Sequence, residues 1–141
     1  MTAPTTAARF VTGCDLVEVA RLACAIDRRA GLVARVFTER EQADARRGGV
    51  RSGSATEHAR LAARFAAKEA TRKALGDLRL PFHAVEVRRQ ADGAPQLWVG
   101  GEPSPLSCSL SHDGGVAIAV VAGFAPASTP APVPAPPDTA S

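Results

Sequence analysis

The sequence predicts an α+β fold in which an antiparallel β-sheet packs against one long helix and shorter helices. Two observations support this class. Residues 54–76 form a long stretch of helix-forming residues that ends at a glycine. After Pro81 the chain changes to alternating and apolar runs with Asp-Gly turns, which is typical of β-hairpins.

The first elements are a short strand and a helix. Residues 10–14 are apolar and β-compatible, and residues 15–31 take on helical character, so Asp15 is expected at the junction. Asp15 and Glu18 have the spacing of a capping box. A capping carboxylate with a spare oxygen can also face a metal, and the sequence leaves both roles open.

The middle of the chain is expected to be helical. Residues 33–38 form an apolar connector, residues 39–47 a short charged helix and residues 48–55 a loop rich in glycine and serine. The long helix begins near Ser54 or Thr56. Gly76 suits its C-terminal cap because glycine adopts the left-handed conformation without a Cβ penalty.

Two hairpins complete the expected fold. Residues 83–99 alternate on both sides of an Asp-Gly turn. In the second hairpin, residues 106–123, serines alternate with apolar residues before a run that is apolar nearly throughout. Its turn contains Ser111, His112 and Asp113, which are explained either as ordinary turn residues or as part of a site.

Arg64, Lys68 and Arg72 form a like-charged ladder on the long helix. Residues four apart are neighbours on a helix, so each pair costs roughly 0.2–0.5 kcal/mol. An anionic ligand would relieve that cost, and a solvated helix face would tolerate it. The opposite half of this helix is rich in alanine and can press closely against a sheet.

Composition predicts one globular domain. Of 141 residues, 45% are hydrophobic, enough for a core. We expect a flexible N-terminus over residues 1–8, the domain over residues 9–124 and a disordered tail over residues 125–141, which holds six prolines in 17 residues. Cys14, Cys24 and Cys108 have no metal or disulfide spacing and are expected to be buried thiols.

Charge and hydropathy limit the classes of ligand and partner that we expect. Residues 21–73 contain 13 Lys and Arg against 6 Asp and Glu, a net of +7, which favours an anionic ligand or an acidic protein. Few aromatic residues accompany the basic ones, so we expect no nucleic-acid binding. No secretion signal or membrane-spanning run is apparent, so we expect a cytoplasmic protein that binds no membrane.

Three motifs in chain order carry a resemblance to a family. They are GCDLVE near the start, RFAAKEATRKALG in the middle and SLSHDGGVAIAVV near the end. Together with a GAP turn at residues 93–95, they resemble the holo-acyl-carrier-protein synthases, which are short 4′-phosphopantetheinyl transferases, over residues 10–124. The resemblance implies their fold and the transfer of 4′-phosphopantetheine from coenzyme A to a serine of an apo acyl carrier protein, with Mg²⁺ as cofactor and release of adenosine 3′,5′-bisphosphate.

The resemblance also implies roles for individual residues. Asp15 and Glu69 match the metal positions, and Glu69 and Lys73 match the catalytic ones. The expected coenzyme A contacts are Arg64, Lys68, Gly76, Ser111 and His112. The base that deprotonates the incoming serine stays open between a metal-bound water, Glu69 and Asp113.

Two surfaces are expected to meet protein partners. Arg21 and Arg28 match positions that contact the acidic carrier protein, and they are seven residues apart, hence on one helix face. The family is typically trimeric, with each site shared between subunits. The alternative class is a noncatalytic phosphate or nucleic-acid binding module, which would use the basic residues without needing Asp15, Glu69 or His112. The resemblance does not settle whether the carrier serves fatty-acid, polyketide or peptide synthesis.

Overall fold

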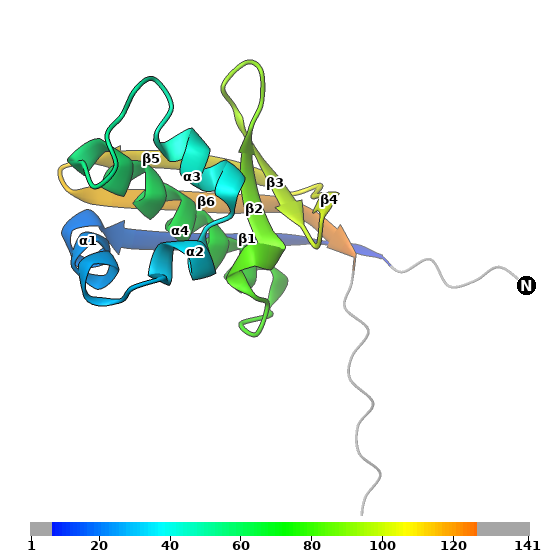
Figure 1. Cartoon of the computed structure of the whole chain (residues 1–141). Helices are drawn as coiled ribbons and strands as arrows, with labels where there is room; N and C mark the ends of the chain where they lie inside the picture. Colours follow the sequence, from blue (N-terminus) through cyan, green and yellow to red (C-terminus); the bar gives the residue numbers. More distant parts are fainter. Residues whose placement is uncertain (1–6, 127–141) are drawn as a thin grey trace, which may run out of the picture.

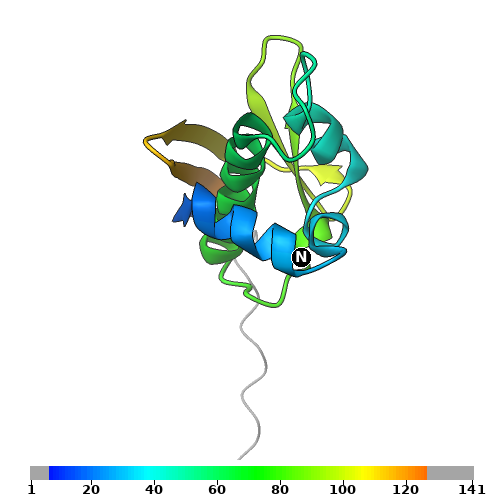
Figure 2. The same cartoon turned by 60° about the vertical axis from the view of Figure 1, so that its left-hand side comes forward.

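Two antiparallel sheets lie on either side of one long helix in the computed structural model, which describes residues 7–126 (Figures 1 and 2). The first sheet has the strand order β1-β6-β5 and the second β2-β3-β4. The elements are β1 (Ala8–Glu18), α1 (Val19–Arg28), α2 (Leu32–Val36), α3 (Glu39–Ala45), α4 (Ala55–Leu75), the 3₁₀ turn η1 (Phe82–Ala84), β2 (Val85–Arg89), β3 (Pro95–Val99), β4 (Glu102–Pro103), β5 (Ser107–Asp113) and β6 (Val116–Pro126).

Strand β1 is longer than the sequence predicted, and this corrects the position of Asp15. The strand pairs with β6 along its whole length, from Ala8 opposite Pro126 to Glu18 opposite Val116. Helix α1 therefore begins only at Val19, with no side-chain cap at Glu18. The expected capping box of Asp15 and Glu18 is wrong, because pairing with a long partner strand keeps Asp15 extended, opposite Ala119.

Helices α3 and α4 begin and end close to the expected residues. Thr38 caps α3 and forms a capping box with Glu41. Ser54 caps α4 by accepting a hydrogen bond from the Glu57 amide, and Gly76 ends it with a φ of 65°. The expected connector at residues 33–38 instead contains the short helix α2.

Both expected hairpins are present, as β2–β3 and β5–β6. Strand β6 continues to Pro126, two residues beyond the expected domain end, and Ala125 is buried. The rest of the expected tail, and residues 1–6, lie outside the described residues. In the part that is described, no helix has the length and apolar character that a bilayer crossing needs.

The alanine-rich face of α4 packs against the first sheet, as its small residues predicted. Ala66, Ala67 and Ala70 are completely buried. The contact is closest at Gly13 of β1, where an added Cβ would lie 1.9 Å from the Ala70 carbonyl oxygen. Only a residue without a side chain fits between this strand and this helix.

The other face of the first sheet is apolar and uncovered in the single chain. In β6, the buried Ala117, Ala119 and Val121 alternate with Ile118 and Val120, which are exposed. Phe10 and Phe124 lie on paired positions with their rings 5.3 Å apart, and both are more than half exposed. Cys14 is also exposed, as is Cys24, so the expectation that these two thiols are buried is wrong.

We predict that Gly13→Ala destabilises the protein by about 1–3 kcal/mol or more, because its methyl group would overlap backbone atoms of α4 that cannot move independently. Urea unfolding measures the change. Thr12→Ala is the matched control, since Thr12 is exposed on the same strand. Equal stabilities for the two variants would contradict the close contact between β1 and α4.

Candidate functional site

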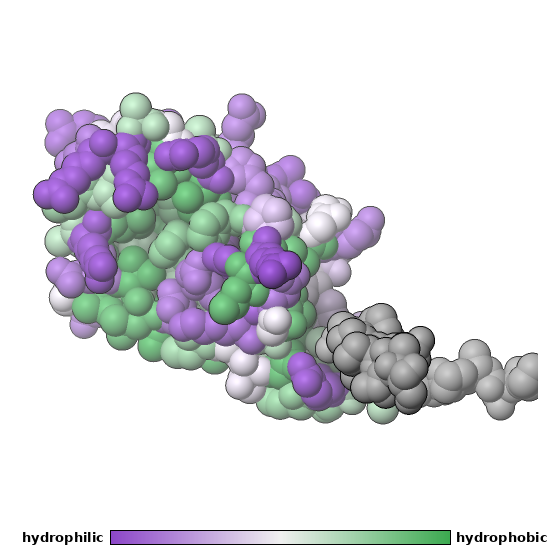
Figure 3. Space-filling model, turned by 90° about the horizontal axis from the view of Figure 1, so that it is seen from below, coloured by the Kyte–Doolittle hydropathy of each residue, from purple (hydrophilic) through white to green (hydrophobic). Residues whose placement is uncertain are grey.

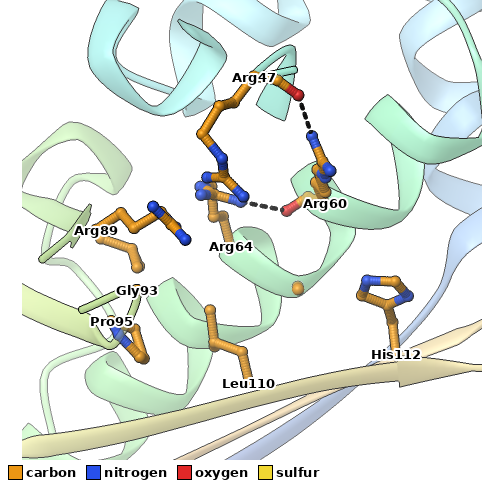
Figure 4. Close-up of a pocket in the computed structure, with 10 residues that line it drawn as sticks. Arg47, Arg60, Arg64, Arg89, Gly93, Pro95, Leu110 and His112 are labelled. Carbon is orange, nitrogen blue, oxygen red and sulfur yellow. Dashed lines mark hydrogen bonds between the residues drawn. The ribbon is translucent and has the colours of Figure 1, made fainter. Parts of the chain in front are cut away.

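Basic side chains surround a pocket of about 290 Å³ beside helix α4 (Figure 4). Its charged or titratable lining residues are all basic and come from the α3–α4 loop, α4, β2 and β5: they are Arg47, Arg60, Arg64, Arg89 and His112. Guanidinium groups present several donors to phosphate or carboxylate oxygens. We call this cavity the arginine pocket, and its lining suits an anion.

The arginine side chains are partly held in place by the protein itself. Arg60 donates to the carbonyl oxygen of Arg47 at 2.8 Å, and Arg64 donates to that of Arg60 at 3.1 Å (Figure 4). Burial lowers the pKa of Arg64, and Asp44, 3.9 Å away, opposes that effect. Its buried Nε atom has no hydrogen-bond partner within the described chain.

A second cavity, of about 700 Å³, lies between β1, α1, α2, α4 and η1. Figure 3 looks from below onto a surface where apolar residues lie among hydrophilic ones. Asp15 and Glu69 line this cavity. Its walls are largely apolar and include Phe65 and Phe82, whose ring centroids are 5.6 Å apart. We call it the acidic cavity.

Two of the three carboxylates that line the acidic cavity, Asp15 and Glu69, are paired with cations from α4, and the third is Glu18. Lys73 Nζ lies 2.9 Å from Asp15 Oδ1 and 3.1 Å from the Cys14 carbonyl oxygen. Arg72 donates to Glu69 Oε1 at 2.8 Å. The hydrogen bond and charge of Asp15 raise the pKa of Lys73, so its ammonium is protonated at neutral pH although the side chain is half exposed.

Asp15 and Glu69 fit a magnesium site. Mg²⁺ is commonly held by one or two carboxylates, with waters and substrate phosphates completing its six ligands. The two carboxylates line one cavity, and no cluster of three or more acidic, His or Cys residues occurs among residues 7–126. This donor set suits a hard cation that shares its ligands with a substrate better than it suits a closed structural site.

The structure gives Lys68 a role different from the expected coenzyme A contact. Its side chain is fully buried, lies 2.7 Å from Glu41 Oε1 and donates to the carbonyl oxygens of Phe82 and Val85. All three of its protons are therefore used. Burial lowers its pKa, and the charge of Glu41 opposes that shift. Lys68 lines neither cavity and is paired inside the protein, and its expected contact with coenzyme A stays a prediction.

The remaining expected residues are scattered around these cavities. Gly76 is the C-cap of α4, and Ser111 is exposed on β5; neither lines a cavity. Arg21 and Arg28 are exposed on α1, and Arg21 borders the acidic cavity. Asp113 accepts a hydrogen bond from the Gly114 amide in the turn.

The two cavities share no lining residue. Arg64 and Glu69 are five residues apart, so at about 100° per residue they point roughly 140° apart on α4. A ligand bound by both residues would have to span two sides of one helix, or meet residues from two copies of the chain.

Sequence reasoning did not identify Arg47, Arg60 and Arg89 as site residues. Arg60 lies one turn before Arg64 and extends the basic ladder, so helical spacing contains the signal for it. Arg47 and Arg89 come from a loop and a strand end, and only the tertiary fold brings them to the pocket.

We predict that Lys68→Met destabilises the fold by about 3–5 kcal/mol, because Glu41 would remain buried without its counterion. Urea unfolding of Lys68→Met and of the double variant with Glu41→Gln measures this, and the double variant should recover part of the loss. Lys73→Met is the control, because exposed ion pairs contribute about 0–1 kcal/mol. Equal losses for Lys68→Met and Lys73→Met would contradict a structural role for the buried pair.

The chain is similar in sequence to members of one protein family. The family model described as "4′-phosphopantetheinyl transferase superfamily" matches residues 12–121. A holo-[acyl-carrier-protein] synthase of Salinispora arenicola is 41% identical over 119 residues, covering 77% of this chain and 93% of the relative. That of Streptomyces coelicolor is 42% identical, covering 77% and 92%.

Solved structures are similar as well. An ACPS–CoA complex of Chronobacterium ammoniagenes is 26% identical, with a TM-score of 0.69 and coverage of 84% of this chain and 98% of that one. A holo-(acyl-carrier-protein) synthase of Bacillus anthracis in complex with CoA (3′,5′-ADP) is 30% identical, with a TM-score of 0.65 and coverage of 82% and 96%.

Proposed function

The chain belongs to the 4′-phosphopantetheinyl transferase superfamily, and from that premise we propose that it transfers 4′-phosphopantetheine from coenzyme A to a serine of an apo acyl carrier protein in the cytoplasm. The observation that carries the proposal is that different charged side chains of α4 serve the two cavities. This one helix supplies Arg60 and Arg64 to the arginine pocket, and Glu69 and Lys73 to the acidic cavity or its edge.

In this proposal, coenzyme A phosphates bind to the arginine pocket. Arg64 and His112 were expected contacts, and Arg47, Arg60 and Arg89 add three further cations. Phosphate groups are strong acceptors for guanidinium donors. A phosphate bound in the pocket would therefore offset the mutual repulsion of these basic side chains. Gly76 and Ser111 stay proposed contacts on the strength of the family resemblance alone.

Asp15 and Glu69 would hold Mg²⁺, which neutralises charge on the pyrophosphate when bound. The serine oxygen forms a bond to the phosphorus that carries pantetheine, while the bond from that phosphorus to the bridging oxygen breaks. The leaving group is adenosine 3′,5′-bisphosphate. Lys73, protonated and half exposed beside Asp15, is placed to stabilise or protonate the leaving phosphate.

The proton of the attacking serine needs an acceptor near the acidic cavity. Glu69 lines that cavity, whereas Asp113 lies in the β5–β6 turn and lines neither cavity of this chain. Within one chain, the geometry therefore favours a base at Glu69 or at a solvent molecule beside it.

The exposed face of α1 would receive the carrier protein. Arg21 and Arg28 are both exposed on this helix, and Arg21 borders the acidic cavity where the serine would have to arrive. Cations at the rim of an interface steer an acidic partner and contribute mainly to the association rate.

We further propose that the protein assembles as a homotrimer through the uncovered face of the first sheet. Ile118, Val120 and Phe124 form exposed apolar positions along β6 on this face. Large exposed apolar patches mark interaction sites.

The transferase proposal predicts that the protein, coenzyme A and Mg²⁺ add one phosphopantetheine to an apo carrier, as seen by mass spectrometry. Glu69→Gln should abolish the mass gain while the fold persists, because it removes a carboxylate from the acidic cavity. Glu39→Gln is the control, being an exposed carboxylate on α3. No mass gain with any carrier in a panel would favour the noncatalytic anion-binding alternative, and full activity of Glu69→Gln would refute the metal assignment.

The trimer proposal predicts that Val120→Glu yields a monomer with little transferase activity, because it places a charge at the centre of the apolar face. Light scattering coupled to gel filtration measures the mass. Leu78→Glu is the control, since Leu78 is 63% exposed but lies outside the sheet. A wild-type protein that is monomeric at the assay concentration would contradict the assembly.

A further inference from the structure

Arg72 is the member of the basic ladder that no part of the proposed reaction uses. It lines neither cavity, yet only 16% of its side chain is exposed. Its Nη1 donates to Glu69 Oε1 at 2.8 Å. The guanidinium therefore touches the carboxylate on which the proposed metal site depends.

Two further contacts hold Arg72 in one position. Its Nη2 donates to the carbonyl oxygen of Leu78, just after α4. Its guanidinium carbon lies 4.7 Å from the centre of the Phe82 ring, within the range of a cation–π contact. Its buried Nε has no hydrogen-bond partner among the described residues. Leaving a buried donor unpaired costs free energy, so the other contacts must determine this conformation.

Glu69 has one oxygen engaged and one available. Its only hydrogen-bond or ion-pair partner among residues 7–126 is Arg72, at Oε1. The side chain is 23% exposed and lines the acidic cavity. A carboxylate held at one oxygen by a fixed guanidinium can present the other oxygen to a cation without rotating.

We propose that Arg72 is a positioning residue, which orients Glu69 toward a divalent cation in the acidic cavity. This inference rests on the proposed function, because it takes Glu69 as a metal-holding residue. Partners that orient a metal-binding side chain typically change metal affinity about 10–100-fold when they are removed. Arg72 would act through Glu69 and would not contact the substrate.

Orientation and charge predict opposite effects of removing Arg72. If only its positive charge mattered, Arg72 would repel a divalent cation, and a neutral side chain would tighten metal binding. If it orients Glu69, the neutral variant binds the metal more weakly despite the lost repulsion. The sign of the change in affinity therefore separates the two roles.

The contrast with Lys73 strengthens this assignment. Lys73 also pairs with a carboxylate of the acidic cavity, but its side chain is 49% exposed. An exposed lysine pair of this kind is weak and leaves the ammonium free to turn toward a substrate. Arg72 is anchored on both a backbone carbonyl oxygen and an aromatic ring. It is therefore better suited to holding Glu69 in a fixed position than to moving toward a substrate as a proton donor.

The test is Mn²⁺ binding to the full chain, measured from the electron paramagnetic resonance signal of the free ion in the absence of coenzyme A. Relative to wild type, Arg72→Gln should weaken Mn²⁺ binding about 10-fold or more. Arg72→Lys should restore the charge but not the affinity, because one ammonium cannot reproduce the two-pronged contact with Glu69 and Leu78. Phe82→Leu should weaken binding less, since it removes a ring that packs on the guanidinium and lines the acidic cavity but leaves both hydrogen bonds of Arg72 in place.

Arg79→Gln is the matched control. Arg79 is exposed three residues after Gly76, and its side chain forms no hydrogen bond or ion pair within residues 7–126. It should leave Mn²⁺ binding unchanged, and thermal unfolding checks that each variant is folded. Unchanged or tighter binding by folded Arg72→Gln would overturn the positioning role alone. Absence of Mn²⁺ binding by the wild type would overturn the proposed metal site, and this inference with it.

Discussion

The buried pair of Lys68 and Glu41 is the contact on which the arrangement of the molecule depends. Burying two charges is costly unless every polar atom finds a partner, and here each does. Lys68 reaches the carbonyl oxygens of Phe82 and Val85 as well as Glu41, whose other oxygen accepts the Val87 amide at 3.1 Å. The pair therefore joins α3, α4, η1 and β2. Of these elements, α4 and β2 line the arginine pocket, and α4 and η1 line the acidic cavity.

Local chemistry made most of the fold predictable from the sequence. Thr38, Ser54 and Gly76 begin or end helices through contacts within a few residues, and the hairpin turns have glycines where a positive φ is needed. Strand β1 was predicted too short for the opposite reason. Its length depends on its pairing with β6, more than a hundred residues later, and the local sequence around Asp15 resembles the start of a helix.

The same distinction applies to the candidate site. Asp15 and Glu69 were predicted from the family resemblance, and the structure places both in one cavity. The pairing of Lys68 with Glu41 was not predicted, because Glu41 lies on another helix and nothing in the adjacent sequence indicates it. Arg89 was missed because it is contributed by a strand end. Spacing along one helix identifies which residues share a face, but it does not identify the side chains that other elements bring to that face.

The basic ladder on α4 shows how a fold assigns different tasks to residues that look equivalent in sequence. Lys68 is neutralised by Glu41 inside the protein, and Arg72 is held by Glu69 at the edge of the acidic cavity. Arg64 has Asp44 only at 3.9 Å and faces three other arginines. It is thus the least compensated of the three cations. Because like charges repel most where counterions are distant, the ladder's attraction for an anion is concentrated at Arg64. That is the end of the ladder that lines the arginine pocket.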